Sequence, residues 1–164
     1  MDGARRQLIM GGLVLAGGIG GSLGARAQTP SPTVAEQFAA RLSAHDIEGF
    51  AALFADDYVN HQTSAAAPSP TNVTPRQATL AFFKGRLAGM PDLQVSIEAM
   101  VAGGDKVAAS FAYSGTHKGT YFGIAPTGKA LRFTSCDIFR VQGGKIAEHW
   151  GMGDIAGVLT QLKG

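Results

Sequence analysis

The chain has 164 residues, of which 45% are hydrophobic and 16% charged, and this composition suits one globular domain rather than two with separate cores. Its formal net charge is +2, but residues 28–164 alone contain 11 basic and 11 acidic side chains, which argues against a nucleic acid or an anionic membrane as partner. The single cysteine, Cys136, excludes an intrachain disulfide, so the core must hold the domain together, and we expect Cys136 to be buried as a small apolar residue.

Residues 1–27 have the pattern of an export signal. Arg5-Arg6 precede a glycine-rich apolar run, and Ala25-Arg26-Ala27 is typical of a cleavage site. The paired arginines favour a twin-arginine-like signal; a general secretory signal or an uncleaved anchor are the alternatives, although the glycines dilute the run below what a membrane span needs. We therefore expect a periplasmic or secreted protein without membrane contact after cleavage, with a linker over 28–33 and one domain over 34–164.

The first half of this domain predicts three helices. Apolar residues recur at helical spacing over 34–44, and Asp46 can cap a second, short helix that extends to Phe54. After an Ala/Pro/Ser/Thr-rich loop over 64–73, Thr74-Pro75-Arg76-Gln77 has the capping-box pattern that begins a third helix. The apolar residues expected to face the core from these helices are Val34, Phe38, Leu42, Ile47, Phe50, Leu53, Phe54, Leu80, Phe83 and Leu87.

After Pro91 the apolar period changes from helical to alternating, which predicts β-strands. The turns Gly103-Gly104-Asp105 and Gly143-Gly144 separate consecutive strands as in a meander, and Asp154 can cap a last helix. Helices followed by antiparallel strands are typical of the α+β class, with a curled sheet packed against helices. The inward faces are expected to hold Leu93, Val95, Ile97, Ala99 and Val101 on one strand, and Val107, Ala109, Phe111, Tyr113 and His117 on the next.

Asp137 is the leading candidate for chemistry. At strand period two it shares a face with Leu131, Phe133 and Phe139, so a carboxyl group is expected among apolar side chains. Burial disfavours its charged form and would suit proton transfer near neutral pH. The alternative is a structural aspartate satisfied by a histidine or a backbone donor.

Three histidines are candidates beside it. His149 lies across the Gly143-Gly144 turn, nearly opposite Asp137, so that the two can form a pair, either catalytic or purely structural. His117 falls at a strand end, where it can line a pocket mouth or lie in a surface turn. His61 follows Tyr58-Val59-Asn60, where it can point into a cavity or cap a helix end.

Other chemistries lack their sequence signals. The histidines and carboxylates do not have the His-x-x-x-His or Glu-x-x-His spacing that places two metal ligands on one helix face, so no metal is expected. Residues 28–164 contain no Gly-x-Ser-x-Gly elbow and no phosphate-binding glycine loop, which argues against a serine nucleophile and a nucleotide. No cofactor is therefore expected.

Several segments together resemble the SnoaL-like polyketide (ester) cyclase family of the NTF2-like superfamily. They are Tyr58-Val59-Asn60-His61, Gly115-Thr116-His117-Lys118-Gly119, 123–128, 137–140 and 144–150, followed by Asp154 and Gln161-Leu162, so that the resemblance covers the chain from about Val34 onward. It implies a cone-shaped α+β barrel, with three N-terminal helices packed on a curved antiparallel sheet, a short C-terminal helix and a ligand cavity between them. It also implies a homodimer.

The resemblance implies cofactor-free acid/base chemistry on a small apolar carbonyl compound, such as aldol cyclisation or isomerisation. The family's acid/base aspartate falls at Gly151, and its pocket histidine falls at Asp137. We therefore expect Asp137 and His149 to be the catalytic residues. The expected substrate-binding residues are Tyr58, Asn60, His61, Phe111, Tyr113, His117, Phe133, Phe139 and Trp150.

Gly151 cannot transfer a proton, which leaves two other functions open. The first is a non-catalytic module that binds a hydrophobic small molecule in the same cavity. The second is an assembly domain that uses the open face of the sheet. Asp137 favours the enzyme, and Gly151 favours the binding module.

Overall fold

The computed structural model describes residues 33–62 and 70–164. The predicted export signal, the linker up to residue 32 and residues 64–69 of the predicted loop lie outside the described residues. The elements, in chain order, are α1 (Thr33–Ser43), α2 (Ile47–Ala52), β1 (Phe54–Asn60), α3 (Pro75–Gly89), β2 (Gln94–Gly103), β3 (Lys106–Thr116), β4 (Ala130–Gln142), β5 (Lys145–Gly153) and α4 (Ile155–Lys163).

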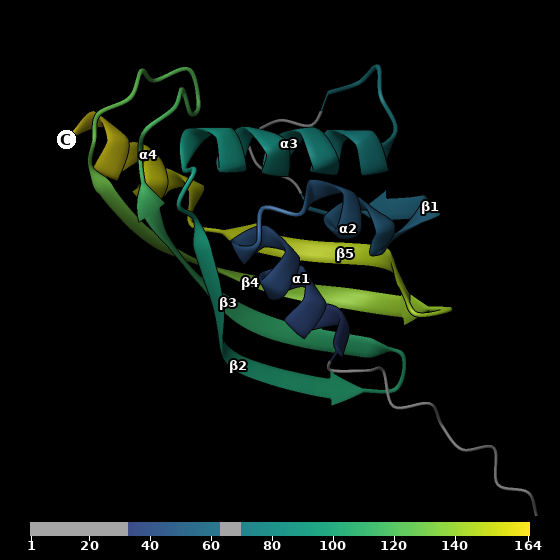
Figure 1. Cartoon of the computed structure of the whole chain (residues 1–164). Helices are drawn as coiled ribbons and strands as arrows, with labels where there is room; N and C mark the ends of the chain where they lie inside the picture. The colour runs from purple at the N-terminus through teal and green to yellow at the C-terminus, as the bar shows by residue number, and fades with distance from the viewer. Residues whose placement is uncertain (1–32, 63–69) are drawn as a thin grey trace, which may run out of the picture.

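The predicted α+β class is confirmed, with three helices before the main strands and a short helix at the C-terminus. The five strands form one sheet in the order β1-β5-β4-β3-β2 (Figure 1). Strands β2 to β5 are antiparallel neighbours, whereas β1 pairs with β5 in parallel. The sheet is thus curved but unclosed, with one parallel edge, rather than the wholly antiparallel barrel that we expected.

Strand β1 occupies residues that the sequence analysis left in or after the second helix. Helix α2 ends at Ala52, and Phe54 begins the strand. The spacing of Phe54 and Tyr58 fits a helix and a strand alike, so periodicity alone does not separate the two. Pairing with β5 decides the outcome, because the Ile146 N–H donates to the Leu53 carbonyl and the His61 N–H donates to the His149 carbonyl.

The predicted helix caps are all present. The Asp46 carboxylate accepts the Gly49 N–H, and the Asp154 carboxylate accepts the Gly157 N–H. Thr74 and Gln77 form both hydrogen bonds of a capping box at the start of α3. These short-range patterns set the helix starts independently of the tertiary structure.

The alternation of inward and outward side chains that the sequence predicts over residues 93–101 is wrong in the second half of β2. A register shift lies between Ile97 and Ala99 in the β2–β3 pairing, as in a β-bulge. The shift moves the next side chains to the other face, so that Met100 packs against the core while Val101 is 70% exposed. A bulge reverses an alternating pattern, and the apolar residues on both sides of it hide the reversal in the sequence.

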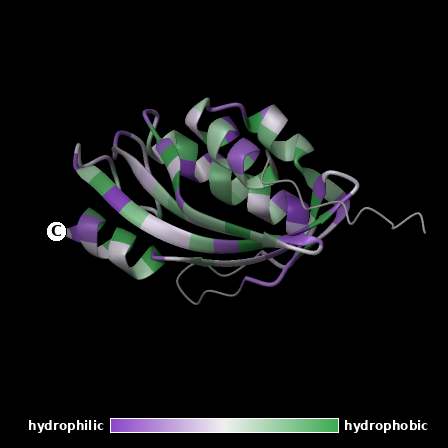
Figure 2. Cartoon of the chain, turned by 90° about the horizontal axis from the view of Figure 1, so that it is seen from below, coloured by the Kyte–Doolittle hydropathy of each residue, from purple (hydrophilic) through white to green (hydrophobic). Residues whose placement is uncertain are grey.

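Helices α1, α2 and α3 lie over one face of the curved sheet, and their apolar side chains meet those of the strands (Figures 1 and 2). Phe38 of α1 contacts the rings of Phe50, Phe83, Phe111 and Phe139 with centroid distances of 5.0–5.4 Å. Helix α4 packs along β4, where Gln161 pairs with both the N–H and the carbonyl of Arg132. The inward sheet face therefore carries the core and the buried polar groups described next.

Candidate functional site

Strand β4 positions Asp137 as the sequence predicted. Along β4, Leu131, Phe133, Asp137 and Phe139 are buried, and the residues between them are more exposed. Asp137 is only 5% exposed to solvent. An ionisable group at such a position requires partners, because an unpaired buried carboxylate is costly.

His149 of β5 is that partner. Its Nε2 lies 2.7 Å from Asp137 Oδ1, and the histidine is only 2% exposed. In the register of β4 and β5, Asp137 lies opposite Gly151 and His149 lies opposite Phe139. The two side chains therefore meet diagonally on one face rather than directly across, which the irregularity between Arg140 and Val141 explains.

A chain of hydrogen bonds continues from His149 to β1 and α3. The Asn60 amide Nδ2 donates to Thr79 Oγ1, and the Thr79 hydroxyl donates to the Tyr58 oxygen. The Tyr58 hydroxyl lies 3.0 Å from His149 Nδ1. Because the Tyr58 oxygen accepts a hydrogen bond from Thr79, its own hydroxyl can donate to His149 Nδ1, and the Nε2–H of that tautomer donates to Asp137. Burial raises the pKa of Tyr58, so the phenol stays protonated.

The second carboxylate oxygen of Asp137 also accepts a hydrogen bond. Ser135 Oγ donates to Asp137 Oδ2 over 2.5 Å, and the Tyr113 hydroxyl lies 3.4 Å from Ser135 Oγ. Burial raises the pKa of Tyr113 to about 12, so this phenol too remains a donor. Asp137 thus accepts a hydrogen bond at each carboxylate oxygen, one from His149 and one from Ser135.

Gly151 provides the space in which this pair lies. A Cβ atom at position 151 would stand 2.6 Å from Asp137 Oδ1, 2.7 Å from His149 Nε2 and 2.9 Å from Gln62 Oε1. These distances are too short for van der Waals contact, so a side chain here would displace the hydrogen-bonded pair. The Asp137–His149 pair can therefore take this position because residue 151 has no side chain.

Aromatic side chains surround the polar network. Phe139 lies 5.1 Å from the His149 ring and contacts Phe111, while Tyr113 and Phe133 stack at 4.9 Å with nearly parallel planes. Six of the predicted site residues on the inner face are thus brought close to Asp137 and His149. They are Tyr58, Asn60, Phe111, Tyr113, Phe133 and Phe139.

Arg86 is the residue that sequence reasoning missed. It lies in α3 with 4% exposure, and its guanidinium carbon is 4.7–5.1 Å from the ring centroids of Phe82, Phe83, Tyr113 and Phe133. Its Nε donates to the Tyr121 hydroxyl over 3.1 Å. The sequence did contain a signal, because Arg86 follows Phe83 by three residues on the stripe that faces the core.

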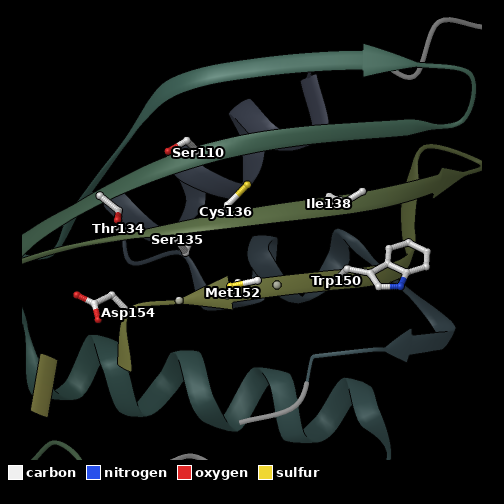
Figure 3. Close-up of a pocket in the computed structure, with 10 residues that line it drawn as sticks. Ser110, Thr134, Ser135, Cys136, Ile138, Trp150, Met152 and Asp154 are labelled. Atoms are coloured by element: carbon white, nitrogen blue, oxygen red, sulfur yellow. The ribbon is translucent and has the colours of Figure 1, made fainter. Parts of the chain in front are cut away.

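Two predicted site residues lie apart from this cluster. His61 stacks on Trp150 with a centroid distance of 4.4 Å, and its Nε2 is 2.7 Å from Glu148. Trp150 follows the inward-facing His149 and therefore points to the other face of the sheet (Figure 3). The hydrogen bonds from His61 and Arg140 lower the pKa of Glu148, and the three residues form a polar cluster near the surface.

His117 is fully buried where the β3–β4 connection begins. The Thr127 N–H donates to His117 Nδ1, and backbone hydrogen bonds join His117 to Lys129 and Gly128. Its Nε2 has no hydrogen-bond partner among the described residues. The histidine thus holds together the two ends of this connection rather than lying in a surface turn.

The outer face of the sheet bears an apolar hollow of about 560 Å³ (Figure 3). Cys136, Ile138, Trp150 and Met152 line it, and Met152 is 80% exposed. Cys136 faces away from Asp137, as expected, but it is exposed rather than buried. It is exposed because none of the three N-terminal helices covers this face of β4.

Within the described ranges, no group of three or more His, Cys, Asp or Glu side chains is arranged to hold a metal ion. None of the helices in those ranges is both long and apolar enough to span a membrane.

Known structures share this fold. IdmH of Streptomyces antibioticus, a candidate polyketide cyclase, is 28% identical, with 80% of this chain and 97% of that chain covered and a TM-score of 0.68. AclR of Streptomyces galilaeus, a candidate hydroxylase, is 24% identical, with coverages of 80% and 93% and a TM-score of 0.69. A Catenulispora acidiphila protein with a ketosteroid isomerase-like fold is 21% identical, with coverages of 81% and 94% and a TM-score of 0.62. No curated protein sequence matches the chain.

The family model of the SnoaL-like polyketide cyclases matches residues 33–162, which is nearly the whole described part of the chain. Both the inner-face network and the segments that carried the sequence resemblance lie within these residues. The family and the similarity to IdmH support a function of the cyclase or isomerase type. The chain therefore belongs to the SnoaL-like polyketide cyclase family.

Proposed function

We propose that the protein is an exported, cofactor-free enzyme of the cyclase or isomerase type that acts on a small apolar carbonyl compound. The buried Asp137–His149 pair carries this proposal, because its 2.7 Å contact places an acid/base group among aromatic side chains. The described donors occupy two of the roughly four lone-pair positions of the carboxylate. Those that remain can accept a proton from a carbon next to a carbonyl.

The reaction requires Asp137 to act first as a base and then as an acid. The carboxylate takes the proton as the C–H bond breaks, and the electron pair moves into the carbonyl to form an enolate. In a cyclisation the enolate carbon attacks a second carbonyl of the same molecule, and Asp137 returns the proton to the new alkoxide. In an isomerisation Asp137 returns it to another carbon. His149 is a positioning residue whose Nε2–H holds the carboxylate in place.

Asp137 would thereby carry the role that the family resemblance assigns to the position of Gly151. The crowding at Gly151 supports this relocation, because even a Cβ atom there would collide with Asp137 and His149. A chain with an acid/base side chain at position 151 would need a different residue at position 137.

Asp137→Asn tests the proposal. The amide oxygen of asparagine can accept the His149 N–H, and its amide nitrogen can donate to Ser135 Oγ, so the midpoint of thermal unfolding should change little. The exchange of the protons next to the carbonyl of β-tetralone into deuterated water, followed by NMR, should fall by about 100-fold or more. Retained exchange in the variant would refute the assignment of Asp137. Binding of β-tetralone without catalysed exchange in the wild type would favour a non-catalytic module that binds hydrophobic molecules.

We also propose a homodimer that forms through the outer face of the sheet, and export of the protein. The first rests on the exposed apolar side chains of Ile138 and Met152 around the hollow on that face. The second rests on the sequence of residues 1–27 alone.

A further inference from the structure

Arg86 is a buried cation that has no carboxylate within ion-pair distance among the described residues. Its Nε donates a hydrogen bond to the Tyr121 hydroxyl, and its guanidinium also interacts with the Tyr113 hydroxyl. A carboxylate partner for its two terminal nitrogens is thus absent from the described residues. Burial alone would lower the pKa of Arg86, but the Tyr121 and Tyr113 oxygens and the Asp137 carboxylate raise it, so the guanidinium is charged.

Aromatic rings compensate only part of the cost of burying this charge. Four rings lie within 4.7–5.1 Å of the guanidinium carbon, and cation–π contacts of this kind are weaker than a buried ion pair. The rings lie around the guanidinium carbon and offer no oxygen lone pair, whereas its N–H groups point outward in its plane. The arrangement holds the cation in place and leaves the terminal donors for a planar anionic oxygen group.

Arg86 is also connected to the Asp137 site. Its guanidinium lies over the Tyr113 ring, the Tyr113 hydroxyl is 3.4 Å from Ser135 Oγ, and Ser135 donates to Asp137. A single aromatic residue and a single serine thus separate the cation from the carboxylate.

We propose that Arg86 binds the oxygen of the substrate that becomes negatively charged when Asp137 removes the proton. This inference rests on the proposed function and narrows its substrate class to carbonyl compounds that form a flat, conjugated enolate. During the transfer, the negative charge leaves Asp137 and appears on the substrate oxygen, so the total charge of the buried site stays constant. Contact with a fixed cation lowers the energy of that charge more than water would, because the site is largely closed to solvent.

Ionisation of para-nitrophenol bound to the full-length protein tests the inference, because its coloured phenolate resembles a conjugated enolate. In the wild type, contact with Arg86 should lower the pKa of the bound phenol by about 1 to 3 units relative to the free phenol, as measured by absorbance titration. Arg86→Met should abolish this shift, and Arg86→Lys should keep part of it. Lys84→Met removes a charge from an exposed position of the same helix and should leave the shift unchanged.

The outcomes separate this inference from the proposed function. A wild-type protein that catalyses Asp137-dependent exchange but leaves the pKa of the phenol unshifted, or does not bind it, overturns the role of Arg86 alone. A shift that depends on Arg86, without catalysed exchange, overturns only the enzyme assignment. If Arg86→Met does not fold, the wild type and Arg86→Lys still decide the matter, because a purely structural arginine predicts no shift in either.

Discussion

Gly151 shows how one missing side chain can make room for a buried polar pair that a neighbouring strand contributes to. Position 151 lies directly opposite Asp137. A Cβ added there would stand too close to Asp137 Oδ1 and to His149 Nε2, the two atoms that form the hydrogen bond. The structural reason for glycine here is close approach, since its backbone does not have the positive φ that favours glycine. The residue is therefore part of the site although it has no functional group.

Gly151→Ala should separate Asp137 from His149. Relief of the 2.6 and 2.7 Å contacts requires one of the two buried side chains to move, so the free energy of unfolding should fall by about 1–3 kcal/mol. Proton exchange on β-tetralone should fall by about tenfold or more, because the carboxylate loses its orientation. Thermal unfolding and NMR measure the two effects.

Gly153→Ala is the matched control for this substitution. It lies two residues along the same strand, and the nearest atoms to its added Cβ are 3.8 Å away, an ordinary van der Waals distance. Equal losses in both variants would show that β5 merely disfavours alanine, and the close approach at Gly151 would not be the cause.

Helix α4 illustrates an element whose start was predictable from a short pattern. Asp154 accepts the Gly157 N–H at 2.8 Å, and Ile155, Val158 and Leu162 are buried against the rest of the domain. The sequence analysis predicted Asp154 as the cap of this last helix. The helix begins directly after it, and its carboxylate satisfies an N–H at the free N-terminus of the helix.

Asp154→Ala should lower the free energy of unfolding by about 1 kcal/mol, because an N-cap hydrogen bond is lost. Asp154→Asn should keep most of the stability, since asparagine caps a helix about as well as aspartate. Chemical denaturation of the three proteins measures the difference. If the asparagine variant is as unstable as the alanine variant, the charge of Asp154 matters more than the cap.

For the molecule as a whole, the two faces of the sheet differ in their partners. The inner face is covered by α1, α2 and α3 and carries the core and the buried network, whereas the outer face bears the apolar hollow beside Met152 (Figures 1 and 3). Exposed apolar side chains gathered around a hollow are typical of surfaces that bind another protein.

Met152→Lys should convert the proposed homodimer to a monomer, because a lysine would place a charge where Met152 is 80% exposed and would be buried on association. Light scattering coupled to size-exclusion chromatography measures the mass. Val73→Lys is the control, since Val73 is exposed just before α3 and away from this face, and it should leave the mass unchanged. A monomeric wild type would contradict the proposal.

The sequence by itself determined the features that depend on near neighbours. Three helices before β2, the predicted caps, the Gly143-Gly144 hairpin and the inward face of β4 all follow from patterns of near neighbours in the sequence. Asp137 and His149 could be paired because one short turn joins their strands, and the family could be recognised because its motifs lie along the whole domain.

Only the tertiary structure decided which residues from distant segments meet. It added β1 in parallel to β5 and so brought Tyr58 to His149, and it buried Arg86 among four aromatic rings. Periodicity gives the face on which a side chain lies but not the element that covers that face. The bulge in β2 and the crowding at Gly151 depend on strand pairing, which sets distances that no local pattern contains.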